Sequence, residues 1–106
     1  MSDLEFSGVT AHALANLYFD GKVVSHTIVL PDGNKKTLGV IFPGDYSFNT
    51  AAAEEMAISA GRVRVRLAGE GEFRSVSAGQ SFHVPEKSSF EVSVDEGVAQ
   101  YVCHYG

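Results

Sequence analysis

Apolar and polar residues alternate in short runs along this chain, and this alternation is its main structural signal. The clearest run is residues 62–67, in which Val63, Val65 and Leu67 alternate with three arginines. Successive side chains of a strand point to opposite faces, so a period of two predicts a strand with one apolar face. Glycine and proline residues separate the runs, a pattern typical of an all-β sandwich or barrel.

Similar short apolar runs predict strands in most of the remaining chain. We expect these strands within residues 16–30, which hold one or two, and at residues 38–42, from 46 onward, 73–76, 81–84, 90–94 and 98–105. A turn is expected at residues 31–34, because proline fixes φ and glycine permits a positive φ. Residues 51–56 fit either one helical turn or the lead-in to a strand, and the nearby Gly61 favours the strand.

Length and charge narrow the class of protein. The chain has 106 residues and a formal net charge of −5, so we expect one compact domain. The acidic balance argues against nucleic acid as a partner, because nucleic-acid binding needs a basic surface. No apolar run approaches the roughly 20 residues of a membrane helix, and the single cysteine excludes an internal disulfide. We therefore expect a soluble cytoplasmic protein that binds neither nucleic acid nor membrane.

Two segments resemble the two signature motifs of the cupin superfamily. Glu54, six residues and then Gly61 match the second half of the first motif. Gly79, five residues and then Pro85 match the start of the second motif. The resemblance implies an all-β fold, a small single-domain cupin β-barrel of the RmlC-like jelly-roll type. We expect residues 1–15 to be a loosely ordered N-terminal segment and residues 16–106 to form the cupin barrel domain.

The positions at which cupins keep their metal ligands carry other residues here. Tyr46 and Phe48 stand near the paired histidines of the first motif, and Phe90 replaces the histidine of the second. A phenylalanine ring has no ligand atom, so neither Phe48 nor Phe90 binds a metal. None of the four histidines forms a histidine pair, and His83 and His104 are expected on the surface. We therefore expect a pocket without a metal or other cofactor.

A more specific resemblance covers about residues 16–105. It rests on the segments 16–23, 44–51, 54–56, 78–79, 82–85, 88–90 and 101–105, the last of which reads Tyr-Val-Cys-His-Tyr. Together these segments resemble the bacterial pyrimidine/purine nucleoside phosphorylase family. The resemblance implies phosphorolysis of purine and pyrimidine nucleosides, with phosphate as co-substrate, to the free base and ribose 1-phosphate. That reaction makes the enzyme a glycosyltransferase, specifically a pentosyltransferase. A homodimer is also implied by resemblance to small cupins.

Phosphorolysis passes through an oxocarbenium-like sugar, so it needs a proton donor for the base and walls that exclude water. Glu54 is the candidate catalytic residue, because burial against aromatic rings would raise its pKa and suit it to proton transfer. A glutamate making only a structural hydrogen bond is the alternative. The candidate substrate-binding residues are Tyr46, Phe48, Thr50, Glu55, Phe90 and Tyr101. The aromatic rings among them, with that of Phe82, either form pocket walls or simply fill a small barrel.

The phosphate site carries the weakest sequence signal. No glycine-rich loop followed by lysine and serine or threonine is present, so a P-loop is excluded. Lys22, Lys87 and Ser88 are the candidate phosphate-binding residues, with solvated surface lysines as the alternative. The inner face of the last strand also holds Cys103, for which we expect buried packing, because phosphate itself is the nucleophile.

The arginines of residues 62–67 are expected to face outward, as a solvated surface or a subunit contact, because period two separates them from the core.

Two other classes of function remain open from the sequence alone. One is a non-catalytic, metal-free cupin that binds a small metabolite, which needs stacking but no phosphate site. The other is a metal-dependent cupin oxygenase or isomerase, which the missing histidines disfavour.

Overall fold

The computed structural model describes residues 4–105, and it is all-β, with no helix in that range. Its eleven strands are β1 (Thr10–Ala11), β2 (Asn16–Tyr18), β3 (Val23–Val29), β4 (Lys35–Ile41), β5 (Gly44–Asn49), β6 (Glu54–Ala60), β7 (Arg62–Leu67), β8 (Arg74–Ser77), β9 (Ser81–Val84), β10 (Ser89–Val94) and β11 (Ala99–Tyr105). An all-β chain built from short strands is what the period-two alternation predicts. Residues 1–3 of the expected N-terminal segment and residue 106 of the expected barrel domain lie outside the described residues.

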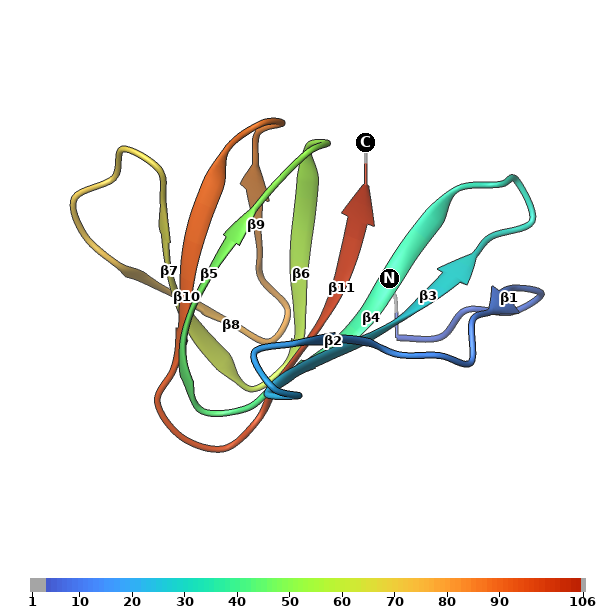
Figure 1. The fold of residues 1–106 in the computed structure, drawn as a ribbon, viewed down its shortest axis with the longest axis horizontal. Coiled ribbons are helices and arrows are strands. Elements are labelled where there is room, and N and C mark those ends of the chain that lie inside the picture. Colours follow the sequence, from blue (N-terminus) through green and yellow to red (C-terminus); the bar gives the residue numbers. More distant parts are fainter. Residues whose placement is uncertain (1–3, 106) are drawn as a thin grey trace.

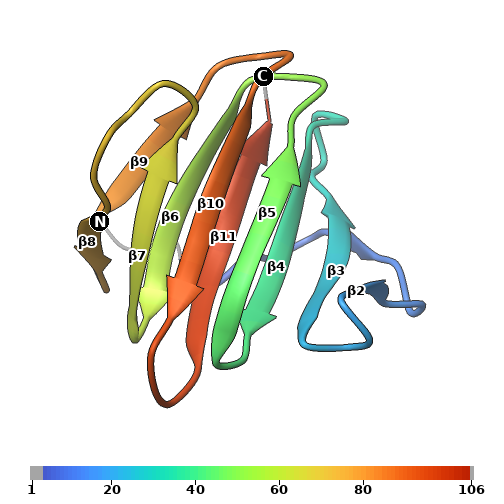
Figure 2. The same cartoon turned by 60° about the vertical axis from the view of Figure 1, so that its left-hand side comes forward.

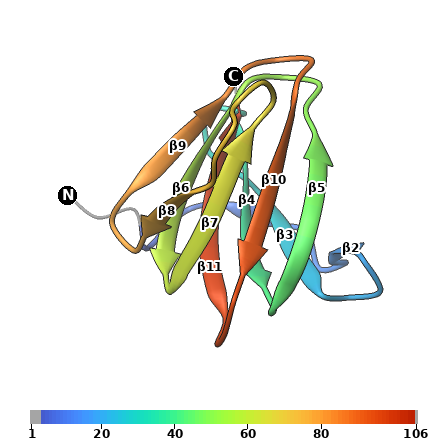
Figure 3. The same ribbon diagram turned by 90° about the vertical axis from the view of Figure 1, so that its left-hand side faces the viewer.

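The strands form two antiparallel sheets that lie against each other (Figures 1 to 3). The larger, seven-stranded sheet has the order β1-β3-β4-β11-β6-β9, with β2 also paired to β3. The smaller, four-stranded sheet has the order β5-β10-β7-β8. Figures 2 and 3 show β5, β10 and β7 as one layer and β4, β11 and β6 as the layer behind it. Strands far apart in the chain are therefore neighbours, as β4 and β11 are.

Strand β7 shows how alternation builds the core. Val63 and Val65 are 1% and 0% exposed, and both belong to the apolar cluster between the sheets. On the opposite face Arg64 pairs with Asp95, and Arg66 pairs with Glu91 of the neighbouring strand β10. The expectation that the arginines face outward is therefore confirmed. Exposed pairs of this kind add little stability, so the valines carry the strand's contribution to packing.

β4 begins well before its expected start, and β6 settles a choice that the sequence left open. β4 begins at Lys35, three residues before the expected start, because Thr37, Gly39 and Ile41 alternate into the interior. The polar residues at its start hide this alternation in the sequence. Residues 54–60 form β6, so the strand interpretation of that segment is confirmed and no helical turn is present there.

The N-terminal segment is tied to the larger sheet at β1. Thr10 and Ala11 pair with β3, and the amide of His12 donates a hydrogen bond of 2.9 Å to the carbonyl of Thr27. Part of the segment expected to be loosely ordered is therefore a short strand. Among residues 4–105 there is no helix of the length and hydropathy needed to cross a membrane.

Candidate functional site

A cavity of about 130 Å³ lies between the two sheets. It is lined by Tyr18, Ser25, Thr37, Ile41, Phe48, Asn49, Glu54, Met56, Phe90, Tyr101, Cys103 and Tyr105. These residues come from β2, β3, β4, β6 and β11 of the larger sheet and from β5 and β10 of the smaller one. The candidates Glu54, Phe48, Phe90 and Tyr101 are thus brought together, although up to 53 residues separate them in the chain.

Stacked aromatic rings form one wall of this cavity. Phe48 of β5 and Phe90 of β10 are directly opposite each other in the sheet register. Their ring centroids lie 5.5 Å apart with an interplanar angle of 22°. Such cross-strand aromatic pairs stabilise a sheet and present a flat apolar surface to whatever lies beside them. Tyr18 meets the edge of Phe48 at 6.1 Å and closes this wall on the side of β2.

Some of the expected wall residues fill the core instead. Phe82 is only 2% exposed and packs edge-on against Phe90 at 5.7 Å, behind the cavity lining. Tyr46 is 5% exposed, and its hydroxyl donates to the carbonyl of Phe42 at 2.7 Å. The Tyr46 hydroxyl also lies 3.0 Å from the carbonyl of Pro43, so it is occupied at the β4–β5 turn. The structure therefore places these two rings outside the cavity lining.

Glu54 is the first residue of strand β6, and its side chain lines the cavity. Burial raises the pKa of this carboxyl, and a hydrogen bond with Cys103 opposes part of that rise. A buried carboxyl holds its proton to a higher pH than an exposed one, because the ionised form loses solvation. Glu54 is therefore placed to give or take a proton beside an apolar, aromatic wall.

The neighbours of Glu54 form a small polar cluster on β4 and β11. Tyr105 is opposite Glu54 in the register, and its hydroxyl lies 3.3 Å from that of Thr37. Burial raises the pKa of the Cys103 thiol to about 12, with the charge of Glu54 as a second cause. The thiol is thus protonated at neutral pH and is not a nucleophile. Burial also raises the pKa of Tyr105, so this cluster offers hydrogen-bond donors.

Thr50 lies in the loop before Glu54, and its hydroxyl forms hydrogen bonds with backbone groups. Its hydroxyl donates to the carbonyl of Pro85 at 2.7 Å and accepts the amide of Ser88 at 2.9 Å. The Thr50 amide in turn donates to the Ser88 carbonyl at 2.9 Å. Thr50 therefore ties the β5–β6 loop to the β9–β10 loop, and it does not line the cavity.

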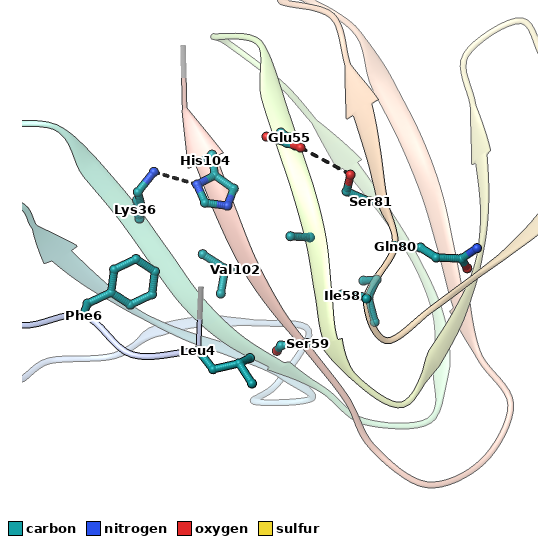
Figure 4. Close-up of a pocket in the computed structure, with 12 residues that line it drawn as sticks. Leu4, Phe6, Lys36, Glu55, Ile58, Ser59, Gln80, Ser81, Val102 and His104 are labelled. Atoms are coloured by element: carbon teal, nitrogen blue, oxygen red, sulfur yellow. Dashed lines mark hydrogen bonds between the residues drawn. The ribbon is translucent and has the colours of Figure 1, made fainter. Parts of the chain in front are cut away.

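Glu55 lies on the opposite face of β6 from Glu54, on the outside of the larger sheet. It lines a solvent-open groove of about 640 Å³ with residues that include Leu4, Phe6 and Val102 (Figure 4). The hydroxyl of Ser81 donates to Glu55 at 3.3 Å, and Nε2 of His83 lies 3.8 Å from the same carboxylate. The structure thus separates Glu55 from the other candidate substrate-binding residues.

His83 and His104 lie on the same outer face of the larger sheet. His104 of β11 lies beside Glu55 in the register, and its Nδ1 accepts from the amino group of Lys36 at 2.6 Å (Figure 4). His83 has a side chain that is 77% exposed. Across the described part of the chain, no group of three or more His, Cys, Asp and Glu side chains is arranged to hold a metal ion.

The candidate phosphate-binding residues lie at two ends of the molecule. Lys87 and Ser88 belong to the β9–β10 turn, next to the start of β6 at Glu54. Lys87 is exposed and holds a left-handed φ of 52°. Lys22 precedes β3, and its carbonyl accepts the amide of Phe42 at the far end of β4. None of the three lines the cavity, and Lys22 is not close to Lys87.

Sequence reasoning did not single out several cavity residues. Ser25 and Thr37 are 3% and 8% exposed and share the inward face of their strands with Val23 and Gly39, two positions away. Period two was the signal that would have found them, but small hydroxyl residues do not stand out in an apolar pattern. Tyr105 shares the inward face of β11 with Tyr101, because the two residues are four positions apart in one strand, and both line the cavity.

When the sequence is compared with known protein families, almost the whole chain matches a single family. The model of the family described as pyrimidine/purine nucleoside phosphorylase matches residues 13–105. A protein named pyrimidine/purine nucleoside phosphorylase from Cupriavidus taiwanensis is 55% identical over 101 residues, covering 95% of both chains. One of the same name from Trichlorobacter lovleyi is 52% identical over 101 residues, covering 95% of this chain and 96% of its own.

Solved structures agree with the fold. A crystal structure of a protein of unknown function from Acinetobacter sp. ADP1 is 44% identical, with a TM-score of 0.93, covering 96% of this chain and 98% of its own. Oxalate decarboxylase from Bacillus subtilis, a cupin-like protein, is only 15% identical but has a TM-score of 0.73, covering 92% of this chain and 28% of its own. That second likeness concerns the fold alone.

Proposed function

This chain belongs to the pyrimidine/purine nucleoside phosphorylase family, and from that membership we propose that it is a nucleoside phosphorylase acting at the interior cavity. In the reaction, the bond between ribose C1′ and the base nitrogen breaks while a phosphate oxygen bonds to C1′. The base leaves with a proton, and ribose 1-phosphate is formed. The enzyme is accordingly a glycosyltransferase of the pentosyltransferase kind, with broad specificity for purine and pyrimidine nucleosides.

One observation carries the location of the site. A half-buried carboxyl with a raised pKa, Glu54, shares its cavity with the stacked pair Phe48 and Phe90. Stacking on an aromatic face accepts every base, because each base has a π-face and stacking does not depend on its edges. A protonated Glu54 supplies the proton or hydrogen bond that the departing base needs. The apolar wall excludes water, which would otherwise intercept the sugar cation.

The size of the cavity sets how a nucleoside enters. Its volume of about 130 Å³ is below the roughly 300 Å³ at which ordinary ligand pockets begin. We therefore place the ribose inside and the base toward Tyr18, which is 46% exposed and covers Phe48 from the side of β2. Tyr18 leads into the β2–β3 turn, where Phe19 holds a left-handed φ of 53°. This turn is the segment we expect to shift when a whole nucleoside binds.

Phosphate is assigned to the end of the cavity at which Glu54 lies. Lys87 and Ser88 of the β9–β10 turn are the candidates there, and turn amides add donors for an anion. Lys22 lies at the other end of β3 and β4, so it does not join the same phosphate site without a large movement. No metal or further cofactor is part of the proposal.

Several broader expectations belong to the same proposal. We take the two sheets to form a small cupin β-barrel of the jelly-roll type. We take the protein to be cytoplasmic and to work as a homodimer, with neither nucleic acid nor membrane as partner. The dimer is tested by light scattering during size-exclusion chromatography, where twice the chain mass of 11.3 kDa is expected and a single-chain mass contradicts it.

The activity is tested by incubating the pure protein with uridine or adenosine, with and without phosphate. We expect free base and ribose 1-phosphate only when phosphate is present, and unchanged rates after treatment with a metal chelator. Base release that ignores phosphate would indicate hydrolysis. Binding of nucleosides without base release would identify a metabolite-binding protein. Loss of activity on chelation, restored by a metal, would contradict the metal-free site.

A further inference from the structure

Four residues on four neighbouring strands stand in one row across the larger sheet. Asn16 of β2 is opposite Ser25 of β3, and Ser25 is opposite Gly39 of β4. Gly39 is in turn opposite Tyr101 of β11. Residues directly opposite each other in a sheet present their side chains on the same face. Because Ser25 and Tyr101 both line the cavity, this row crosses the cavity wall.

Gly39 leaves the space in which the Tyr101 ring lies. A Cβ atom at residue 39 would overlap the ring carbons and the hydroxyl of Tyr101. Gly39 is therefore needed for room rather than for an unusual φ. The ring extends across β4 toward β3, where the Ser25 hydroxyl acts on the Tyr101 hydroxyl and lowers its pKa, against the larger effect of burial. Ser25 itself is 3% exposed, so its interaction with Tyr101 is shielded from water.

The hydrogen bonds of Asn16 bear on which hydroxyl group in the row donates and which accepts. Its side-chain Nδ2 donates to the hydroxyl oxygen of Ser25 at 3.1 Å and to that of Thr27 at 3.2 Å. An amide nitrogen is a donor only, so the Ser25 oxygen accepts from Asn16 and its own proton is left to donate. A proton donated by Ser25 to the Tyr101 oxygen lowers the pKa of Tyr101, which is the direction in which Ser25 acts, and it leaves the Tyr101 proton turned away from Ser25. Burial raises the pKa of Tyr101, so the hydroxyl keeps this proton at neutral pH.

We propose that Asn16 and Ser25 are positioning residues that orient the Tyr101 hydroxyl as a donor to the base, at the acceptor beside its glycosidic nitrogen. That acceptor is O2 in a pyrimidine and N3 in a purine, the one edge feature that both classes share next to the sugar. A single donor at this place serves both classes of nucleoside. It also stabilises the charge that the base gains as the glycosidic bond breaks. The inference rests on the proposed function and identifies how that site accepts both kinds of base.

The test compares adenosine with 3-deazaadenosine, in which a C–H group replaces N3. The unmodified protein is expected to bind adenosine about tenfold more tightly than 3-deazaadenosine, because 3-deazaadenosine loses one buried hydrogen bond. Tyr101→Phe should abolish this preference, because the donor is gone. 7-Deazaadenosine, which keeps N3, is the control nucleoside and should lose no more in the variant than adenosine does. Calorimetry without phosphate measures binding, and base release with phosphate measures kcat/KM for the same pairs.

Positioning is tested with Asn16→Asp. The aspartate accepts from Ser25, which reverses the row, so the Tyr101 proton turns toward Ser25 and the preference for adenosine should fall about tenfold as in Tyr101→Phe. Thr27→Val is the matched control, because it removes the other partner of Asn16 and does not touch the cavity. In a Tyr101→Phe background, Asn16→Asp should cause no further loss of preference. Circular dichroism and thermal melting verify that each variant is folded.

The outcomes separate this inference from the proposed function. Protein that binds adenosine but releases no base contradicts the proposed function, while the binding preferences still decide the role of the row. An unchanged preference in Tyr101→Phe overturns the donor assignment. Equal preferences in Asn16→Asp and Thr27→Val overturn the positioning role of Asn16. Protein that binds no nucleoside overturns both proposals.

Discussion

Glu54 and Glu55 are adjacent in β6, yet they belong to different regions of the molecule. Glu54 faces the interior cavity, where burial raises the pKa of its carboxyl. Glu55 faces the outer groove, where it accepts from Ser81 and lies near the exposed His83. The difference arises from the pleat alone, since successive side chains of a strand point to opposite faces. Only the inner carboxyl meets aromatic walls and a low-dielectric environment.

The larger of these two hollows is not the one in which we propose the chemistry. The outer groove has about 640 Å³ and the inner cavity about 130 Å³. Polar groups in the outer groove include the amino group of Lys36, which donates to His104 (Figure 4). The inner cavity combines a carboxyl, hydroxyls and stacked rings in a shielded space. Electrostatic effects are stronger where water is excluded, so shielding is a better guide to the active site than volume.

The largest effect that separates the two regions is expected from Glu54→Gln. This change keeps the shape but removes the proton, so kcat should fall by about 10²–10⁴, the usual contribution of a general acid. The measurement is base release from uridine or adenosine in the presence of phosphate. The matched control is Glu55→Gln on the outer face, which should keep kcat/KM within about twofold. Similar losses in both variants would show that the pleat does not divide the residues as described.

Stability separates the same regions through two phenylalanines. Phe82→Ala opens a cavity in the core and should lower the free energy of unfolding by about 3–5 kcal/mol. Phe73 is 37% exposed and lies under the guanidinium of Arg66 on the outside, so Phe73→Ala should cost about 1 kcal/mol or less. Urea unfolding measures both. A cost for Phe73→Ala that equals that of Phe82→Ala would contradict the assignment of inner and outer faces.

The buried carboxyl also predicts a pH dependence. Because burial raises the pKa of Glu54 in the folded state above its ordinary value of 4.5, the folded state binds more protons than the unfolded state above that pH. The free energy of unfolding therefore falls as the pH rises from 4.5 through the folded-state pKa. Glu54→Gln removes this loss, so the stability of the variant relative to the unmodified protein should increase over that range. A difference that stays constant from pH 4 to pH 8 would contradict it.

The smallest effect is expected on the outer face at His104. His104→Ala removes the acceptor of Lys36 but touches neither Glu54 nor the stacked rings. Activity should remain within about twofold, and the free energy of unfolding should change by roughly 0.5 kcal/mol. Base release and thermal melting check these values. A large loss of activity with an unchanged melting temperature would move the functional site to the outer groove.

Much of the candidate site was predictable because its signals are local in the chain. Glu54 was identified from its spacing to Gly61, and Phe48 and Phe90 from their places in two motifs. Thr50 and Glu55 lie in the same matching segments, but one ties two loops together and the other faces outward. Segment matching does not distinguish these roles, since it records position and not side-chain direction.

The sequence by itself determined the all-β class, the family and the carboxyl at Glu54, because alternation and motif spacing are written within short stretches of chain. Only the tertiary structure decided which side chains meet across the sheets. Asn16, Ser25 and Tyr101 form one row because the register of β2, β3, β4 and β11 aligns them. β2, β3 and β4 follow one another in the chain, but β11 lies far from β4, and only the pairing of these two strands brings Tyr101 into the row. A one-residue shift in that pairing would reverse every inward face of the strand.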